Sequence, residues 1–307
     1  MHTPVLINEL IDMLDIKPNG TYIDCTGGGG GHAGALLKRL SPEGRLVVLD
    51  RDPQAGKRLV EKFRGDKRVS VYQCNFSNLD LAMHESGIDQ ADGIYADFGI
   101  SSYQINDGSR GFSFRNDGPI DMRLNPAEGL SAAEVVNTFT AENLAMIIAK
   151  FGEDKFAKRI AGEIVRRRAL KKLVTTSELA DVVRDAVPKK FHKKGVHPAT
   201  QTFQALRIYV NSELESIREL MEKIGSLIKV GGRFGAISFH SLEDRIVKES
   251  LAEYAKECIC PPELPVCVCD KLAEFRIITR KPIVPTEKEV EENPLSRSAK
   301  LRIAEKL

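Results

Sequence analysis

A glycine-rich segment between an apolar run and a helical pattern is the first candidate for chemistry. It reads DCTGGGGGH, from Asp24 to His32. Glycines let backbone N–H groups approach a ligand closely and adopt positive φ angles, and the start of the following helix adds partial positive charge. Asp24, at the end of the apolar run, is placed to hold an ammonium group. The segment predicts a loop that binds an anionic or carboxylate-bearing ligand.

A second acidic residue narrows the ligand. The next apolar run, RLVVLD, ends on Asp50, where a carboxylate can accept hydrogen bonds from both hydroxyls of a ribose. The two features indicate an adenosine-containing cofactor, with a surface-turn acid as the alternative for Asp50. The five consecutive glycines lack the G-x-G-x-x-G spacing of nicotinamide dinucleotide sites, which favours S-adenosylmethionine over a dehydrogenase cofactor.

Two later apolar runs end in residues suited to an adenine ring and an amine. The third ends in Asn75-Phe76, whose ring can lie against adenine or belong to the core. The fourth ends at Asp97 and leads into FGISS, where a methyltransferase places its target-base loop. A carboxylate there can accept hydrogen bonds from an exocyclic amine and point its lone pair at a methyl group. Binding of the cofactor alone is the other role open to Asp97.

Ser101 and His240 are further catalytic candidates. Amino-methyltransferases usually follow the acid with Pro-Pro and an aromatic residue, and here FGIS replaces that pattern. Phe112 or Phe114 is the candidate for the stacking ring, with a core residue that anchors the loop as the alternative. His240 follows an apolar run, at the sheet edge where ligands bind. Its neighbours Ser241 and Asp244 fit an S-x-x-D capping box, so a helix start is the alternative for this segment.

Positive charge is concentrated in one segment of the chain. Residues 150 to 210 contain 15 Lys and Arg against 6 Asp and Glu, whereas the net charge of the whole chain is +2. Such a cluster of positive charge favours binding of a polyanion such as nucleic acid, although a set of solvated helix faces would show the same composition. We expect contacts with RNA through Arg166, Arg167, Arg168, Lys171 and Lys172.

Four of the six cysteines, Cys258, Cys260, Cys267 and Cys269, lie in the short segment CICPPELPVCVC. A reducing compartment argues against two disulfides. Four thiols can bind Zn²⁺, but the spacing is C-x-C rather than the usual C-x-x-C. We therefore expect no metal, with zinc held by these thiols as the alternative.

These residues require a parallel sheet to position them. Apolar runs alternate with helical patterns from residue 21 to 98, which is typical of repeated βα units. Loop and helix signals follow from residue 102, one long amphipathic helix is expected from about 199 to 228, and a strand then returns to the sheet. A helix should begin near residue 240, and FRIITR and KLRIAEK should form two late strands, with the last antiparallel at the sheet edge.

Over nearly its whole length the sequence resembles a known family, the bacterial ribosomal RNA small-subunit methyltransferase H family, also called the MraW family. The matching segments are HTPVL, GGGGH, VLDRDPQA, DFGISSYQ, RGFSFRNDGPIDMR, SAAEVVN, FGEDKFAKRIA, HPATQTFQALRIYVNSEL, GGRFGAISFHSLEDRIVK and NPLSRSAKLRIAEK. The resemblance implies an α/β fold with a class I, Rossmann-like S-adenosylmethionine methyltransferase sheet. It also implies a cofactor site formed by Gly30, Gly31, His32, Asp50, Phe76, Asp97 and Gln104.

The resemblance further implies N(4)-methylation of a cytidine in the decoding region of 16S rRNA. The methyltransferase domain is expected at residues 1–105 and 210–307, and an inserted helical domain that recognises rRNA at residues 106–209. The expected partner is 16S rRNA in the small ribosomal subunit, and the enzyme is expected to be a monomer or homodimer. A non-catalytic rRNA-binding or ribosome-assembly factor on the same fold is the alternative.

Composition excludes several other classes of protein. The chain has 42% hydrophobic and 29% charged residues, enough to bury a full core and too apolar for a disordered chain. It has no run of about 18 apolar residues, and its start lacks the basic and apolar regions of a signal peptide. A cytoplasmic protein without membrane spans is expected.

Overall fold

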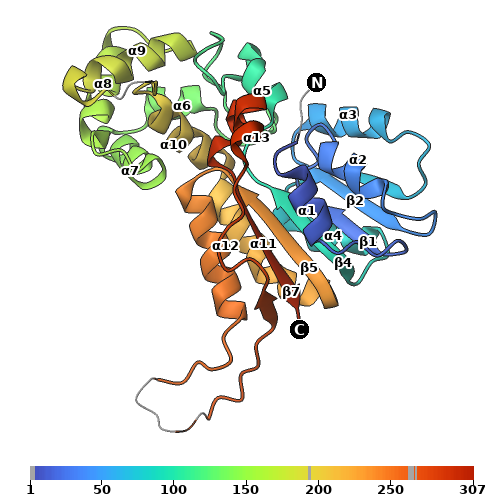
Figure 1. Ribbon diagram of the computed structural model, residues 1–307. Coiled ribbons are helices and arrows are strands. Elements are labelled where there is room, and N and C mark those ends of the chain that lie inside the picture. Colours follow the sequence, from blue (N-terminus) through green and yellow to red (C-terminus); the bar gives the residue numbers. More distant parts are fainter. Residues whose placement is uncertain (1–3, 193–194, 262–265, 267) are drawn as a thin grey trace. The chain divides into compact units, whose positions relative to one another are not determined.

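The computed structural model describes residues 4–192, 195–261, 266 and 268–307. Among these residues a seven-stranded sheet has the order β3-β2-β1-β4-β5-β7-β6 (Figure 1). The strands are β1 (Thr21–Asp24), β2 (Arg45–Asp50), β3 (Val69–Gln73), β4 (Ala91–Asp97), β5 (Ile228–Ser238), β6 (Phe275–Ile277) and β7 (Lys300–Lys306). The expected α/β sheet of class I methyltransferases is confirmed.

Strands β1 to β5 are parallel, and they bring the ends of several apolar runs to one edge of the sheet. Asp24 ends β1, Asp50 ends β2 and Asp97 ends β4. Strand β4 is buried along all but its last residue, because it lies between β1 and β5 in the middle of the sheet. The order reverses between β1 and β4, which makes this carboxyl edge the expected binding crevice.

The last strand does not lie at the sheet edge, and that expectation was wrong. Strand β7 pairs antiparallel with β5, with Phe234 opposite Ala304, and its other side pairs with β6. Leu301 and Ile303 are fully buried in this position. The short β6 forms the edge instead, since three residues give it less apolar surface to bury than seven give β7.

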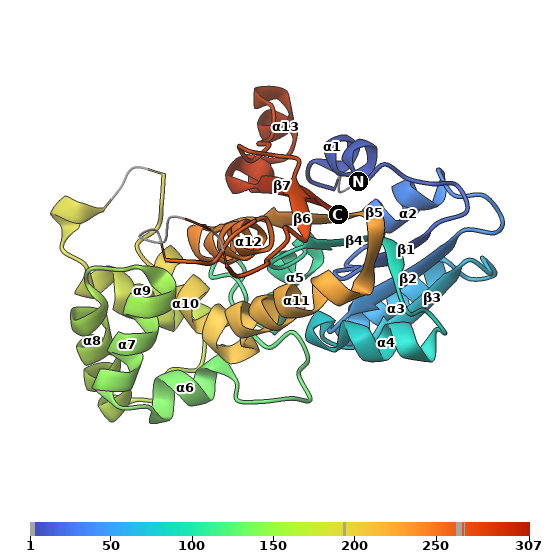
Figure 2. The same ribbon diagram turned by 90° about the horizontal axis from the view of Figure 1, so that it is seen from below.

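Helices cover both faces of the sheet. Figure 2 shows α1 (Ile7–Met13) and α2 (Gly31–Leu37) on one face, and α4 (Leu79–Glu85) and α11 (Glu213–Leu227) on the other. The core on the α1–α2 face joins Leu6, Leu10, Leu36 and Leu59 to strand residues such as Tyr95. The remaining helices around the sheet are α3 (Pro53–Lys62), η1 (Phe76–Asn78), α12 (Ser241–Tyr254), α13 (Glu287–Glu292) and η4 (Pro294–Ser298).

The chain divides into two compact units. Unit 1 comprises Met1–Gly99 and Leu214–Leu307, and unit 2 comprises Ile100–Glu213. The expected boundaries, after residues 105 and 209, lie six and four residues away from these. Unit 2 contains α5 (Ser102–Asn106), η2 (Gly108–Arg110), α6 (Ala132–Thr138), α7 (Ala141–Gly152), α8 (Ala157–Leu170), α9 (Thr176–Ala186), η3 (Lys189–Phe191) and α10 (Thr200–Asn211).

The single helix expected from about 199 to 228 is two helices. Helix α10 ends at Asn211, and Ser212 adopts a left-handed conformation with φ 50°, which interrupts the helix before α11. Arg207 and Glu213 are joined by two hydrogen bonds of 2.9 and 2.8 Å. Each of the two helices has its own buried apolar face, so the apolar periodicity of the sequence continues through the break. The pattern alone therefore does not reveal that the helix is interrupted.

Among the described residues, no helix combines the length and apolar character needed to span a bilayer.

Candidate active site at the carboxyl edge of the sheet

The glycine loop joins β1 to α2 and is anchored from the neighbouring strand. The amide of Gly27 donates to the carbonyl of Leu49 at 2.7 Å, and the amide of Gly28 donates to Asp50 Oδ2 at 2.7 Å. The Lys62 ammonium donates to the carbonyls of Gly29 and Gly30 at 2.8 and 2.7 Å. The loop conformation is thus fixed by β2 and α3 before any ligand binds.

Glycines in this loop are required by space or by backbone conformation. A Cβ atom on Gly27 would lie 2.5 Å from a methyl group of Leu59, and one on Gly31 would overlap Pro4. Gly28 and Gly30 have φ +53° and +69°, left-handed conformations that other residues rarely adopt. The consecutive glycines therefore allow the loop to pack closely against neighbouring side chains such as Leu59 and Pro4. At Gly28 the nearest atom to a Cβ would be 3.8 Å away, so this glycine leaves room for a ligand.

Asp50 organises the loop and keeps acceptor capacity. Its Oδ2 accepts from Gly28 and its Oδ1 accepts from the amide of Asp52 at 2.8 Å. Burial raises the pKa of the Asp50 carboxyl to about 6, and the two backbone donors oppose that shift. Each carboxylate oxygen can accept a second hydrogen bond. This is the arrangement that a pair of ribose hydroxyls requires.

Asp24 is buried, and both of its carboxyl oxygens accept hydrogen bonds from the protein. It is 1% exposed, its Oδ1 accepts from the amide of Thr26 at 2.9 Å, and its Oδ2 accepts from the Tyr95 hydroxyl at 2.9 Å. Burial raises the pKa of this carboxyl to about 7. The role predicted from sequence, direct contact of Asp24 with an ammonium group, does not fit this burial, and the residue instead shapes the turn into the loop.

Asp97 is the carboxylate best placed to meet a ligand. Its side chain is 24% exposed, yet its Oδ1 atom is buried and has no hydrogen-bond partner among the described residues. Its backbone amide donates to Thr26 Oγ1 at 2.6 Å, which fixes the end of β4 against the loop. Burial, and then the nearby charges of Asp24 and Glu243, raise the pKa of Asp97 well above its usual value.

His32 shows where a proton lies in this cluster. Its Nε2 is 2.9 Å from the carbonyl of Val5, which only accepts, so Nε2 carries a hydrogen. Its Nδ1 lies 3.7 Å from Asp97 Oδ2. With Nε2 protonated, a neutral ring has its unprotonated Nδ1 on the side of Asp97, at a distance too long for a hydrogen bond. Cofactor binding by His32 stays a prediction, and the residue lies beside Asp97 in α2.

Phe76 lies in η1, directly after the third strand. Its ring is partly exposed and packs against Phe98, with ring centroids 5.6 Å apart. Asn75 caps η1 by accepting from the amide of Ser77 at 3.1 Å, and its Nδ2 donates to Ser216 at 2.8 Å. Phe76 is thus held by its neighbours while part of its ring remains available for stacking.

The capping box after β5 is one residue earlier than expected, so the Ser241–Asp244 assignment was wrong. His240 is the N-cap of α12 and pairs with Glu243, whose Oε2 accepts from the amides of Phe239 and His240 at 2.8 and 3.2 Å. Asp244 is occupied elsewhere, because it accepts from Arg302 at 2.7 Å. The Nδ1 atom of His240 accepts from the amide of Glu243 at 3.4 Å, and its Nε2 lies 3.1 Å from Glu243 Oε1. These are the contacts of a helix start, and catalysis by His240 stays a prediction.

Ser101 and Gln104 belong to unit 2 and form a capping box at the start of α5. The amide of Gln104 donates to Ser101 Oγ at 3.3 Å, and the amide of Ser101 donates to Gln104 Oε1 at 2.8 Å. Gln104 is 6% exposed. Catalysis by Ser101 and cofactor binding by Gln104 stay predictions, because the observed contacts of both residues are those of a helix start.

The three arginines expected to bind RNA differ in their partners. Arg166 and Arg167 both donate to Glu163, at 2.8 and 2.9 Å. Arg168 instead donates to the backbone carbonyls of Val136 and Phe139 and so supports the end of α6. Two of the three therefore present paired charge on α8, and the third has a structural role within unit 2.

The two lysines that follow α8 also differ from each other. Lys171 pairs with Glu178 at 2.7 Å and is 76% exposed. Lys172 lines a surface hollow of about 260 Å³, which Asp121 and Asn137 also line. RNA contact by these lysines and by the arginines stays a prediction.

Three residues that organise the site were missed by the sequence reasoning. Tyr95 donates to the carboxylate of Asp24, Thr26 fixes the backbone of Asp97, and Lys62 holds the loop carbonyls. Tyr95 lies within an apolar strand, where its ring predicts core and nothing indicates its hydroxyl partner. The sequence did contain a signal for Lys62, which lies at the end of the helix that follows Asp50. From there its side chain can reach the glycine loop at the end of the neighbouring strand.

The residues at this edge fit S-adenosylmethionine. Asp97 offers a buried oxygen that has no partner among the described residues, Asp50 offers acceptors to a ribose, and Gly28 leaves space beside it. The sulfonium and ammonium groups of the cofactor carry positive charge, whereas the charges of Asp24 and Glu243 repel that of Asp97. A cationic ligand would relieve that repulsion.

Comparison with known proteins identifies relatives of this chain. The model of the MraW methylase family matches residues 1–307. A protein of Clostridioides difficile (strain 630) named ribosomal RNA small subunit methyltransferase H is 48% identical over 307 residues, covering 100% of this chain and 99% of the relative. A protein of the same name from Geobacter sp. (strain M21) is 48% identical over 309 residues, covering 100% and 98%. The crystal structure of an rRNA methylase from Streptococcus thermophilus aligns with 11% identity and a TM-score of 0.44, covering 100% of this chain and 99% of that one.

Proposed function

We propose, because this chain belongs to the MraW methylase family, that it methylates the exocyclic N(4) amine of a cytidine in the decoding region of 16S rRNA. Membership of the family makes it an S-adenosylmethionine-dependent methyltransferase. The names of its relatives support a small-subunit rRNA substrate. The observation that carries the chemical part of the proposal is the buried Oδ1 atom of Asp97, which has no hydrogen-bond partner among the described residues.

The chemistry of the amine explains why a carboxylate is needed. The lone pair of a cytosine amine is delocalised into the ring, which makes it a poor nucleophile. When bound, S-adenosylmethionine supplies a sulfonium methyl group, a strong electrophile with a neutral leaving group. The protein therefore has to contribute alignment. Asp97 would accept a hydrogen bond from the amine and turn its lone pair toward the methyl group.

The raised pKa of Asp97 is compatible with this role once the cofactor is considered. Without a ligand, burial and neighbouring acids favour the protonated carboxyl. A nearby positive charge favours the ionised form instead. Asp97 would then be an acceptor when the cofactor is present, with the Nδ1 atom of His32 3.7 Å from its other oxygen.

The second unit is proposed to bind the rRNA. Its net positive segment, residues 150 to 210, contains exposed cations such as Arg166 (61% exposed) and Lys171 (76% exposed). Phosphate groups are bound through such side chains, and binding releases counterions. Partial pairing with acidic neighbours reduces, and does not remove, the positive charge of this surface.

Transfer of labelled methyl groups tests the proposal. Small subunits from cells that lack the modification are incubated with the full chain and labelled S-adenosylmethionine, and the rRNA is digested to nucleosides. We expect label in N(4)-methylcytidine alone, and none with the Asp97→Asn variant at early times. Label in another nucleoside would contradict the assignment of the amine, and no transfer to any rRNA substrate would contradict the function.

A further inference from the structure

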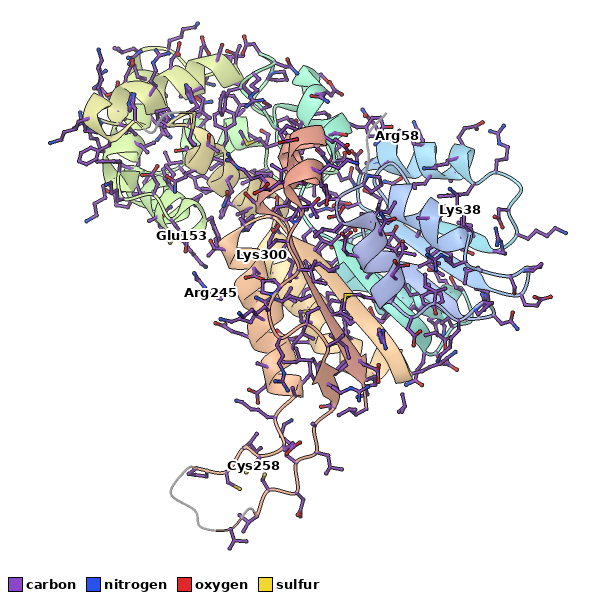
Figure 3. All side chains as sticks on the ribbon, in the orientation of Figure 1. Lys38, Arg58, Glu153, Arg245, Cys258 and Lys300 are labelled. Atoms are coloured by element: carbon purple, nitrogen blue, oxygen red, sulfur yellow. The ribbon has the colours of Figure 1, made fainter. Side chains whose placement is uncertain are left out.

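Three cysteines lie together at the end of the sheet opposite the candidate active site. Helix α12 begins at the carboxyl edge and extends for 14 residues, a length of about 21 Å at 1.5 Å per residue. The segment from residue 255 to 274 follows and leads into β6. Figure 1 shows this segment extending beyond the end of α12, and Figure 3 shows Cys258 on it. Any chemistry here is therefore separate from methyl transfer.

The sulfur atoms have the spacing of a metal site. The Sγ atoms of Cys258, Cys260 and Cys269 all lie within 4.8 Å of one another. The Sγ atoms of Cys258 and Cys269 are 3.8 Å apart. Zinc–sulfur bonds of about 2.3 Å in a tetrahedron place neighbouring sulfurs roughly 3.8 Å apart. A disulfide would require about 2.05 Å, so the observed separation fits two ligands of one ion.

Backbone amides support negative charge on each of the three sulfurs. The amide of Ile259 donates to Cys269 Sγ at 3.4 Å, and that of Cys260 donates to Cys258 Sγ at 3.4 Å. The amide of Val268 donates to Cys260 Sγ at 3.3 Å. Amide donors of this kind orient thiolate ligands and stabilise their charge. The two ends of the loop thus donate to one another's sulfurs.

The described apolar side chains of the loop do not form a core that would gather these thiols. Ile259 is 59% exposed, Val266 70% and Val268 71%. Cysteines outside disulfides are usually buried, whereas Cys258 is exposed. Sulfur atoms collected on an exposed loop are better explained by a shared ligand than by packing.

We propose that Cys258, Cys260 and Cys269 bind a Zn²⁺ ion that holds the two ends of this loop together. A set of thiolates selects zinc over hard cations such as Mg²⁺ or Ca²⁺. The sequence-based expectation was no metal, with zinc as the alternative, and the geometry favours the alternative. Cys267 lies outside the described residues and is not part of the proposal. The ion is structural, since the length of α12 separates it from the carboxyl edge.

Metal analysis of the full chain tests this site. The protein is purified under reducing conditions without a chelator, and its zinc is measured by mass spectrometry beside a Cys258→Ser/Cys260→Ser/Cys269→Ser variant. Cys74→Ser is the matched control, because Cys74 is a cysteine outside the loop. We expect stoichiometric zinc in the parent and in the control and a loss of zinc in the triple variant. Equal zinc in the triple variant and the parent would overturn the proposal.

Cobalt gives a reading that does not depend on folding of the triple variant. Replacing zinc with Co²⁺ in the parent protein should give thiolate-to-metal charge-transfer bands and the ligand-field bands of a tetrahedral site. Cys269→Ser alone should weaken the charge-transfer bands. Binding of S-adenosylmethionine should be unchanged in all of these proteins. The zinc site would be contradicted if the parent protein lacked these bands. It would also be contradicted if two of the three cysteines formed a disulfide in protein purified under reducing conditions.

Discussion

The carboxyl edge of the sheet and the arginines of α8 differ in how far their ionisable groups are buried and paired. At the edge, acidic groups are buried together, and Asp97 keeps an oxygen without a hydrogen-bond partner among the described residues. On α8, the side chains of Arg166 and Arg167 are more exposed than that of Asp97, and both pair with Glu163. One buried carboxyl oxygen that has no hydrogen-bond partner among the described residues thus indicates a ligand site more specifically than several exposed and mostly paired cations do.

The largest expected effect comes from replacing Asp97, whose Oδ1 atom has no hydrogen-bond partner among the described residues. Asp97→Asn keeps the shape and one acceptor oxygen but removes the charge. We expect kcat to fall about a hundredfold with saturating S-adenosylmethionine, the scale on which one positioned group acts. Steady-state kinetics at several cofactor concentrations provide the measurement. Full turnover at saturation, with only a raised KM for the cofactor, would restrict Asp97 to binding.

A smaller effect is expected at Asp50, whose carboxylate already has two backbone donors. Asp50→Ala should weaken cofactor binding by about 1.5–3 kcal/mol, the scale of charge-assisted hydrogen bonds. Asp50→Asn is the matched variant, because it keeps one acceptor for the glycine loop. Titration calorimetry measures both, with circular dichroism to check folding. Unchanged affinity in Asp50→Ala would remove this residue from the site.

The buried acids should also make the ligand-free protein less stable as pH rises. Burial raises the pKa of Asp24 to about 7 and that of Asp50 to about 6, above the usual range of an aspartate. The native state therefore holds protons that the unfolded chain has lost, and this stabilisation is present below about pH 4 and lost as pH rises through about 6–7. Urea unfolding at a series of pH values across this window should show a falling free energy of unfolding.

Two variants separate this effect from the other titrating groups. Asp24→Asn should flatten the decline. Asp92→Asn should not, because its burial, which raises the pKa, is outweighed by hydrogen bonds from Lys229 and Thr21, so the pKa of Asp92 is lowered. The contribution of such a group to stability is complete above its unfolded pKa. A decline of equal slope in Asp24→Asn and the parent would show that the raised acids are not its source.

The smallest effect is expected on α8 and the residues that follow it. Replacing Arg166, Lys171 and Lys172 with Gln should lower the salt dependence of subunit binding, by roughly 0.7–0.9 in logarithmic slope for each phosphate that is no longer neutralised. Arg168 should be left in place, since it donates to the carbonyls of Val136 and Phe139 and its replacement would disturb α6. Salt titrations of binding make the measurement.

Exposed cations of unit 1 provide the control for that comparison. Arg64 and Lys288 are 74% and 83% exposed, and replacing both with Gln should leave the salt slope unchanged. Affinity for S-adenosylmethionine should be unaffected by either set of changes. If the two sets lower the slope equally, the basic residues after residue 150 have no specific part in binding the subunit.

The sequence predicts what depends on local pattern. The apolar runs that end on Asp50 and Asp97 indicate the ends of two strands, and parallel topology brings those ends together. The features that it does not predict depend on distant partners. Asp244 fits a capping box in sequence, but Arg302 on β7 binds its carboxylate, and Glu243 caps the helix instead.

Two other differences have the same origin. Arg168 reads as one of three equivalent cations, and only the folded unit turns it toward the carbonyls of Val136 and Phe139. The break at Ser212 falls inside a regular apolar periodicity and occurs where the chain passes from one compact unit to the other. Neither the direction of a side chain nor a single left-handed residue is contained in a hydrophobic pattern.

We predict that the carboxyl edge of the sheet holds protonated acids until a cationic ligand binds. The number of protons released on binding measures this directly. Titration calorimetry near the raised pKa values of Asp24 and Asp50, in buffers of different ionisation enthalpy, counts those protons. We predict net release with S-adenosylmethionine, less with S-adenosylhomocysteine, which lacks the sulfonium charge, and less with the Asp97→Asn variant. Equal proton counts for the two ligands, or net proton uptake with S-adenosylmethionine, would contradict the account.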